Sequence, residues 1–151
     1  MRYAFTMIEL VFVIVVLGIL AGVALPRLLA PADDARLVKA KSTISSIRSA
    51  ISLAKNKSIL GGTGASYPSS LDDAAYNTDN EELFDGNATQ KILEYPIYSK
   101  SSGGWIKSSD NNYSLNIEGK NVVFIYNSNT GKFTCDTNNS DYGSTCLKLL
   151  K

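Results

Sequence analysis

Few side chains of this 151-residue chain could form a catalytic or metal-binding centre, because the chain has no histidine. That absence excludes Ser-His-Asp and Cys-His nucleophiles as well as metal sites with histidine ligands. Its two cysteines, Cys135 and Cys146, are too few for a four-cysteine zinc site. Catalysis by paired carboxylates or by lysine remains open, but the composition disfavours it, and we expect a protein that is not an enzyme.

One carboxylate has an unusual setting. Glu9 is the only charged residue between Tyr3 and Pro26, and it lies in the apolar run Phe5–Leu25. As a helix this run would be about 31 Å long, which matches the hydrocarbon core of a bilayer. A domain of this size does not need a helix that is apolar on every face, so the run predicts membrane insertion. An ionisable group in such a span costs a few kcal/mol and indicates a function.

The segment Ala4–Ala21, AFTMIELVFVIVVLGILA, closely resembles the N-terminal motif of the type IV pilin and type II secretion pseudopilin superfamily. In that family a prepilin peptidase removes a short basic leader before a phenylalanine and methylates the new N-terminus. The resemblance implies cleavage between Ala4 and Phe5, methylation of Phe5, and retention of the apolar helix. A removable secretory signal, cut near Ala24, and a buried core helix are the alternatives.

The resemblance also implies a role for Glu9 in assembly. In a filament, its carboxylate would pair with the Phe5 amine of a neighbouring subunit, so that two costly charges neutralise each other. A Glu9 that reaches the membrane interface or is protonated is the alternative. The implied partners are other pilin-like subunits, prepilin peptidase and an inner-membrane assembly platform. The implied location is the bacterial inner membrane, crossed once, with a head in the periplasm or in an extracytoplasmic filament.

Beyond the apolar run, Pro26 and Pro31 predict a kink or a locally melted turn, with the kink at Pro26. A helix that ends there and begins again at Pro31 is the alternative. Helical periodicity then continues to about Ile59, and Gly61-Gly62 would end this helix. Its apolar stripe, which we expect to pack on a sheet, comprises Leu37, Ala40, Ile44, Ile47, Ile51 and Ala54. Basic residues on the remaining surface would face solvent, lipid headgroups or an acidic partner: Arg36, Lys39, Lys41, Arg48, Lys55 and Lys57.

The rest of the chain predicts a head of mixed structure. Residues 62–112 are rich in loops, with short helices expected at 69–76 and 88–94. Alternating and β-branched residues predict strands at 113–117, 122–126 and 132–135, with a fourth near Trp105. The expected fold is α+β and pilin-like, with a long N-terminal helix on a small antiparallel sheet of three to four strands. Its parts would be a leader (1–4), a transmembrane segment (5–25), an amphipathic helix (26–60) and a head domain (61–151).

The C-terminal part holds two kinds of candidate site. Cys135 and Cys146 predict a disulfide if the head lies outside the cytoplasm. Between them, Asp136, Asn138 and Asp141 supply oxygen atoms of the kind that bind calcium, although no EF-hand spacing is present. No other cofactor is expected.

Three asparagines lie in the pattern acidic-x-Asn-x-Ser/Thr, which is similar to the extended acceptor site of bacterial N-glycosylation systems. They are Asn87, Asn112 and Asn138. Chance clustering of turn-forming residues is the alternative explanation.

The net charge of +1 hides a division along the chain: residues 1–61 sum to +5 and residues 62–151 to −4. The acidic head argues against nucleic-acid binding by this subunit. Together with the resemblance, these features predict a structural subunit, a pseudopilin, of a type II secretion-type filament that supports protein export. The alternatives are a type IV pilin, major or minor, for adhesion, motility or DNA uptake, and a membrane-anchored periplasmic binding domain.

Overall fold

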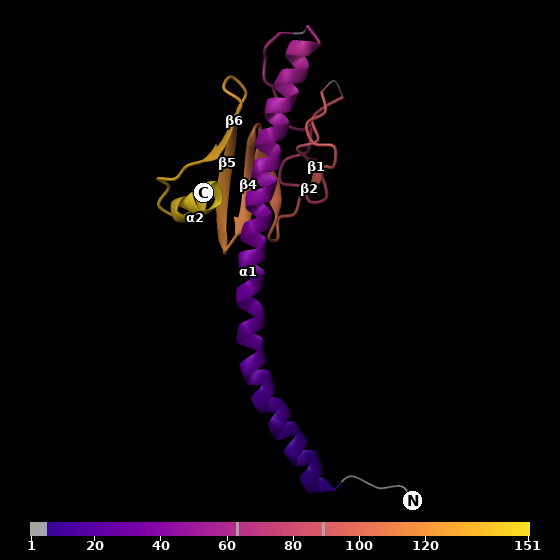
Figure 1. Ribbon diagram of the computed structural model, residues 1–151, viewed down its shortest axis with the longest axis vertical. Coiled ribbons are helices and arrows are strands. Elements are labelled where there is room, and N and C mark those ends of the chain that lie inside the picture. Colours follow the sequence, from indigo (N-terminus) through magenta and orange to yellow (C-terminus); the bar gives the residue numbers. More distant parts are fainter. Residues whose placement is uncertain (1–5, 63, 89) are drawn as a thin grey trace, which may run out of the picture. The chain divides into compact units, whose positions relative to one another are not determined.

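The computed structural model describes residues 6–62, 64–88 and 90–151, and the side chains of residues 23–33 lie outside that description. The chain divides into two units, Met1–Arg36 and Leu37–Lys151. One helix, α1 (Met7–Leu60), contributes residues to both (Figure 1). All the strands and the second helix belong to the second unit, which is the head.

Helix α1 continues without a break through Pro26 and Pro31. The expected melted turn, and the alternative of a helix that ends and restarts here, are therefore wrong. A proline removes only one helical N–H donor, and neighbouring leucine and alanine residues favour the helical state. The kink expected at Pro26 stays a prediction, because its side chain is outside the described residues.

The head contains a four-stranded antiparallel sheet in the order β3-β4-β5-β6. The strands are β3 (Trp105–Ser109), β4 (Asn112–Ile117), β5 (Lys120–Asn127) and β6 (Lys132–Cys135). This confirms the three predicted strands and the fourth near Trp105. Between β4 and β5, Glu118 and Gly119 both have positive φ, at 51° and 70°. Such a pair forms the tight hairpin turn that matches strand twist, and glycine adopts it without strain.

The core lies between the C-terminal half of α1 and the inner face of the sheet (Figure 1). The predicted stripe is confirmed: Leu37 is half-buried, and the other five members are at most 5% exposed. Opposite the stripe is an aromatic cluster in which neighbouring ring centroids lie 4.5–6.0 Å apart. Its rings are Phe84, Trp105, Tyr113, Phe124 and Phe133. These side chains join α1, the sheet and one loop of the head in a single apolar core.

One basic residue of α1 is not on a solvated face as expected. The Arg48 guanidinium donates two hydrogen bonds, from Nε and Nη2, to the carbonyl oxygen of Phe133 in β6, at 2.9 and 2.8 Å. Partial burial lowers the pKa of Arg48, and the side chain ties the helix to the edge strand.

The segment between α1 and the sheet contains no helix among its described residues, so the helices expected at 69–76 and 88–94 are wrong. It forms two short paired strands, β1 (Glu82–Leu83) and β2 (Ile97–Tyr98), and bridges from Gly86 to Asp72 and Lys91. Gly86 has φ +98°, and a Cβ there would lie 2.0 Å from the Gln90 carbonyl oxygen. A close backbone approach of this kind excludes helical geometry.

A short helix that the sequence did not predict, α2 (Gly143–Leu150), follows β6. It lacks a side-chain N-cap hydrogen bond, and serine, threonine and cysteine in its first turn have low helix propensity. Burial of Cys146 and Leu149 against the core therefore supplies its stability.

Candidate functional site

The start of α1 is fixed by a reciprocal pair of side chains. The Glu9 carboxylate accepts hydrogen bonds through Oε2 from the Thr6 backbone N–H, at 2.9 Å, and from the Thr6 hydroxyl, at 2.8 Å. In return, the Glu9 backbone N–H donates to Thr6 Oγ1 at 3.4 Å. This is a capping box, which satisfies N–H groups that a helix start leaves without partners. The Thr-x-x-Glu spacing in the sequence is the signature of this cap, which is a further role for Glu9 beside the one expected in assembly.

Beyond the cap, α1 presents apolar side chains that the chain itself does not cover. From Met7 to Leu20, each large apolar residue is at least 36% exposed, and most are near or above half. Gly18 has open space around it as well. Exposed apolar surface on all sides of a helix needs an apolar environment from elsewhere.

The predicted cleavage and methylation positions, Ala4 and Phe5, lie outside the described residues. Within the residues that are described, no helix combines the length and the apolarity needed to cross a membrane.

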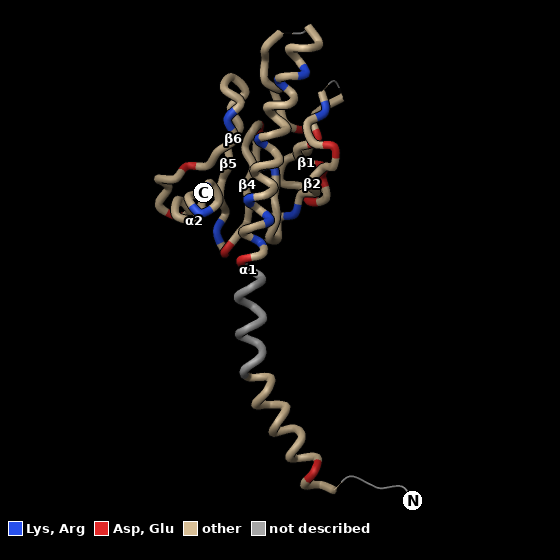
Figure 2. Tube along the Cα trace, viewed as in Figure 1, with Lys and Arg blue, Asp and Glu red and all other residues tan. Residues whose placement is uncertain are grey.

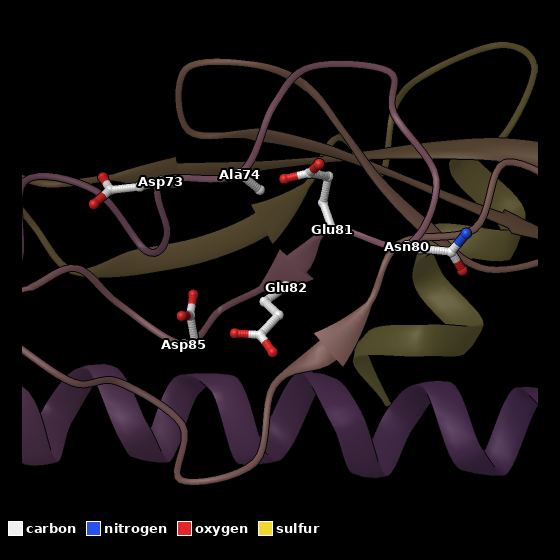
Figure 3. A pocket seen from close by; sticks show the side chains of 6 residues that line it. All are labelled: Asp73, Ala74, Asn80, Glu81, Glu82 and Asp85. Atoms are coloured by element: carbon white, nitrogen blue, oxygen red, sulfur yellow. The ribbon is translucent and has the colours of Figure 1, made fainter.

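In the head, acidic side chains line an open hollow of about 280 Å³ beside β1 (Figure 3). It is lined by Asp73, Ala74, Asn80, Glu81, Glu82 and Asp85. Burial raises the pKa of Asp85, and the charges of Asp72, Glu82 and Asp73 raise it further. Figure 2 shows acidic positions along the loops around β1 and β2 and basic positions along the helix of the head.

Asp72, which precedes the hollow's Asp73 in the sequence, belongs to a buried ion pair. Lys107 Nζ is 2.9 Å from Asp72 Oδ1, and the two side chains are 5% and 0% exposed. The second carboxylate oxygen of Asp72 accepts the Phe84 backbone N–H at 2.9 Å, and Lys107 also donates to the Asp72 carbonyl at 3.1 Å. Burial and the nearby Asp72 charge raise the pKa of the Tyr113 hydroxyl, which has no hydrogen-bond partner among the described residues. Because the charges of Asp72 and Lys107 are paired with each other, these two residues form a structural link between the loop and β3.

The residues predicted as a calcium site occupy the loop between β6 and α2. Asp141 already has a cation, because Lys120 Nζ lies 2.6 Å from its Oδ1. Asp136 Oδ1 accepts the Asn138 backbone N–H at 2.8 Å. Among the described residues, no group of three His, Cys, Asp or Glu side chains is placed to hold a metal ion.

The disulfide between Cys135 and Cys146 is confirmed and joins the end of β6 to α2. Its two cysteines are separated by 11 positions, and both are buried. Of the three candidate acceptor asparagines, Asn112 lies in β4, Asn87 is half-buried in a loop, and Asn138 is exposed inside the disulfide-closed loop.

Comparisons with protein-family models, with curated proteins and with solved structures each found no match to this chain.

Proposed function

We propose that this chain is a structural subunit of a type IV pilus-like filament, processed by prepilin peptidase, and that it catalyses no reaction. The observation that carries the proposal is the N-terminal part of α1. Its first turn contains one acidic residue, Glu9, and its apolar side chains are exposed on all sides through Leu20. The same helix then continues to Leu60 in the head. Apolar helices of neighbouring subunits, or lipid before assembly, would cover such a surface.

The geometry of Glu9 supports its proposed role in assembly. Both hydrogen bonds from Thr6 reach one oxygen, Oε2, and Oε1 accepts none from the described residues. A carboxylate with an available oxygen can keep its cap and also accept the Phe5 amine of a neighbouring subunit. Removing either partner of such a pair in an apolar filament core would leave an uncompensated charge.

Membrane insertion and processing belong to the same proposal. The proposed transmembrane segment, residues 5–25, extends at both ends beyond the residues whose side chains are described. The disulfide supports a head outside the cytoplasm, because reducing compartments keep thiols reduced. Prepilin peptidase, an inner-membrane assembly platform and other pilin-like subunits are the proposed partners.

The first experiment is mass spectrometry of the N-terminus after expression with and without a prepilin peptidase. We expect loss of Met1–Ala4 and a methylated Phe5 only when the peptidase is present, and no cleavage of the Phe5→Asp variant. An intact Met1 in both samples would contradict the proposal. A cut after Ala24 would instead identify a removable secretory signal.

A second experiment separates the two roles of Glu9. Glu9→Gln keeps a side chain that can form the capping box but removes the charge, whereas Thr6→Ala removes the cap and keeps the charge. In cells that carry the assembly machinery, we expect Glu9→Gln to abolish incorporation into filaments and Thr6→Ala to retain it. The opposite pattern would show that Glu9 acts only as a cap.

Within this proposal a secretion pseudopilin is the first assignment, because the head is small and its Trp105–Ile117 region resembles that class. The type IV pilin is the second candidate, which the disulfide Cys135–Cys146 favours. A deletion strain distinguishes them. Loss of exported proteins from the medium would support the secretion assignment, whereas loss of long surface fibres with normal export would support the pilin.

A further inference from the structure

The three asparagines in acidic-x-Asn-x-Ser/Thr segments share a sequence pattern but differ in the surroundings that the fold gives them. An oligosaccharyltransferase that acts on a folded chain must bind the acceptor segment and reach the asparagine amide. The fold therefore selects among the three segments, which comprise residues 85–89, 110–114 and 136–140.

The segment around Asn112 includes the start of β4, which is hydrogen-bonded to β3 on one side and to β5 on the other. Asn112 is paired with Ser109 of β3 and with Ile125 of β5, and Ser114 is likewise paired on both sides. The Asn112 amide Nδ2 also donates to Ser109 Oγ at 2.8 Å. An enzyme could bind this segment only by separating two pairs of strands.

The segment around Asn87 is held in a tight loop. Asn87 Oδ1 accepts the Gln90 backbone N–H at 2.8 Å, and its own N–H donates to the Gln90 carbonyl at 3.1 Å. The preceding acidic residue, Asp85, is half-buried, and its carbonyl accepts the Ile92 N–H at 2.9 Å. The hydroxyl residue of this segment, Thr89, lies outside the described residues.

The segment around Asn138 is accessible at all three recognised positions. Asp136, Asn138 and Ser140 are exposed, and the side-chain amide of Asn138 makes no hydrogen bond within the part of the chain that the structure describes. The loop does not pair with a strand, and its local bonds are short turns such as Asp136 Oδ1 to the Asn138 N–H. The disulfide joins residues at the two ends of the loop, and its cysteines are buried, whereas Asp136, Asn138 and Ser140 between them are exposed.

We propose that Asn138 is the acceptor of an N-linked oligosaccharide and that the fold protects Asn87 and Asn112 from this modification. The donor class is an oligosaccharide linked to a lipid through pyrophosphate. The Asn138 Nδ2 atom forms a bond to C1 of the first sugar, and the bond from C1 to the pyrophosphate oxygen breaks. The lipid pyrophosphate leaves with the electron pair, and the amide releases one proton to solvent.

In a cell the inference depends on the extracytoplasmic head of the proposed function, so the test uses purified components. The full-length, disulfide-bonded chain in detergent is incubated with a bacterial single-subunit oligosaccharyltransferase and its lipid-linked donor, and the intact mass is measured. We expect one glycan per chain and at least a tenfold loss of modification in Asn138→Gln and in Asp136→Ala. The matched controls Asn87→Gln and Asn112→Gln should be modified like the unsubstituted chain.

A chain that is reduced, alkylated and unfolded is the second arm. There we expect glycans at Asn87 and Asn112 as well, because the fold no longer protects them. A folded chain that gains no glycan, or one whose glycan remains in Asn138→Gln, would overturn the inference. Neither result would bear on leader cleavage or filament assembly, which are measured in separate experiments.

Discussion

Asp72 and Lys107 show how single residues secure the loop region of the head. Their charges are almost completely removed from water, and each carboxylate oxygen of Asp72 has a donor. Such a pair adds little net stability compared with apolar residues, but loss of one partner leaves a buried charge unpaired. The pair therefore contributes little to the net stability of the head, and its main effect is to favour one position of the loop on β3.

Lys107→Met should destabilise the head by about 3–5 kcal/mol, because Asp72 would remain charged and buried. Urea unfolding followed by fluorescence of Trp105, the chain's only tryptophan and a core residue, measures this change.

The matched control is Lys120→Met at the exposed pair with Asp141, which should cost less than about 1 kcal/mol. Equal losses in the two variants would contradict the interpretation. The double variant Asp72→Asn/Lys107→Met should recover part of the loss.

Asp85 predicts a pH dependence of stability. Because burial raises its pKa in the folded head above the ordinary 3.8, ionisation of Asp85 favours the unfolded chain. Its contribution to stability is complete below the unfolded pKa and is lost as pH rises through the folded pKa. Asp85→Asn should therefore unfold at a higher temperature than the unsubstituted head at pH 7, and the gain should vanish below about pH 3.8.

Thermal unfolding between pH 3 and pH 7 measures the effect of Asp85→Asn. Glu94→Gln, which removes one negative charge at an exposed position, is the control. A gain that stays constant with pH, or a loss at pH 7, would refute the assignment.

At the scale of elements, the two described stretches of α1 differ in burial, because the apolar residues from Met7 to Leu20 are exposed. Its C-terminal stretch buries a stripe on the sheet, and Arg48 fastens it to the carbonyl of Phe133 at the edge strand. The disulfide and α2 secure the opposite end of β6. On the loop-entropy model, this disulfide stabilises the head by about 3 kcal/mol.

The stripe can be tested with two apolar residues of α1 that differ in burial. Ile47 is 0% exposed and Leu53 is 53% exposed. Ile47→Ala should cost about 2–5 kcal/mol, because it removes core contacts and leaves a cavity. Leu53→Ala should change the free energy of unfolding by about 0.5 kcal/mol or less. Chemical denaturation gives both values, and similar costs would show that the stripe does not define the buried face.

At the scale of the whole molecule, charge and apolar surface are divided along the chain. Residues 1–61 sum to +5 and residues 62–151 to −4, because most acidic residues lie in the second part, and the exposed apolar run belongs to the first unit. In the proposed function, this division would place the first unit in an apolar environment and the head in an aqueous one.

The Leu17→Arg variant should separate membrane insertion of the first unit from folding of the head. An arginine at the centre of a membrane helix costs about 2.5–3.5 kcal/mol, so partition of the full chain into phospholipid vesicles should fall about 100-fold. Because Leu17 belongs to the other unit, unfolding of the head followed at Trp105 should stay unchanged. Leu17→Ile is the control and should partition normally. An unchanged partition of Leu17→Arg would argue against membrane insertion of this segment.

Periodicity and composition alone predicted the long helix, its buried stripe, the strands and the disulfide, because each depends on local spacing or on two matching residues. The Thr6–Glu9 cap was equally local, although its Thr-x-x-Glu signature was overlooked.

Tertiary structure decided what depends on residues far apart in the sequence. Asp72 and Lys107 form a pair across 35 positions, and neither has a local signature that marks it as buried. The same holds for Arg48, for α2, and for the loop that replaces the two expected short helices. The three asparagine motifs are alike as sequence, and only the pairing of strands and the closed loop make Asn138 accessible while Asn112 is held in the sheet. Accessibility depends on packing, and packing is a property of the folded chain as a whole.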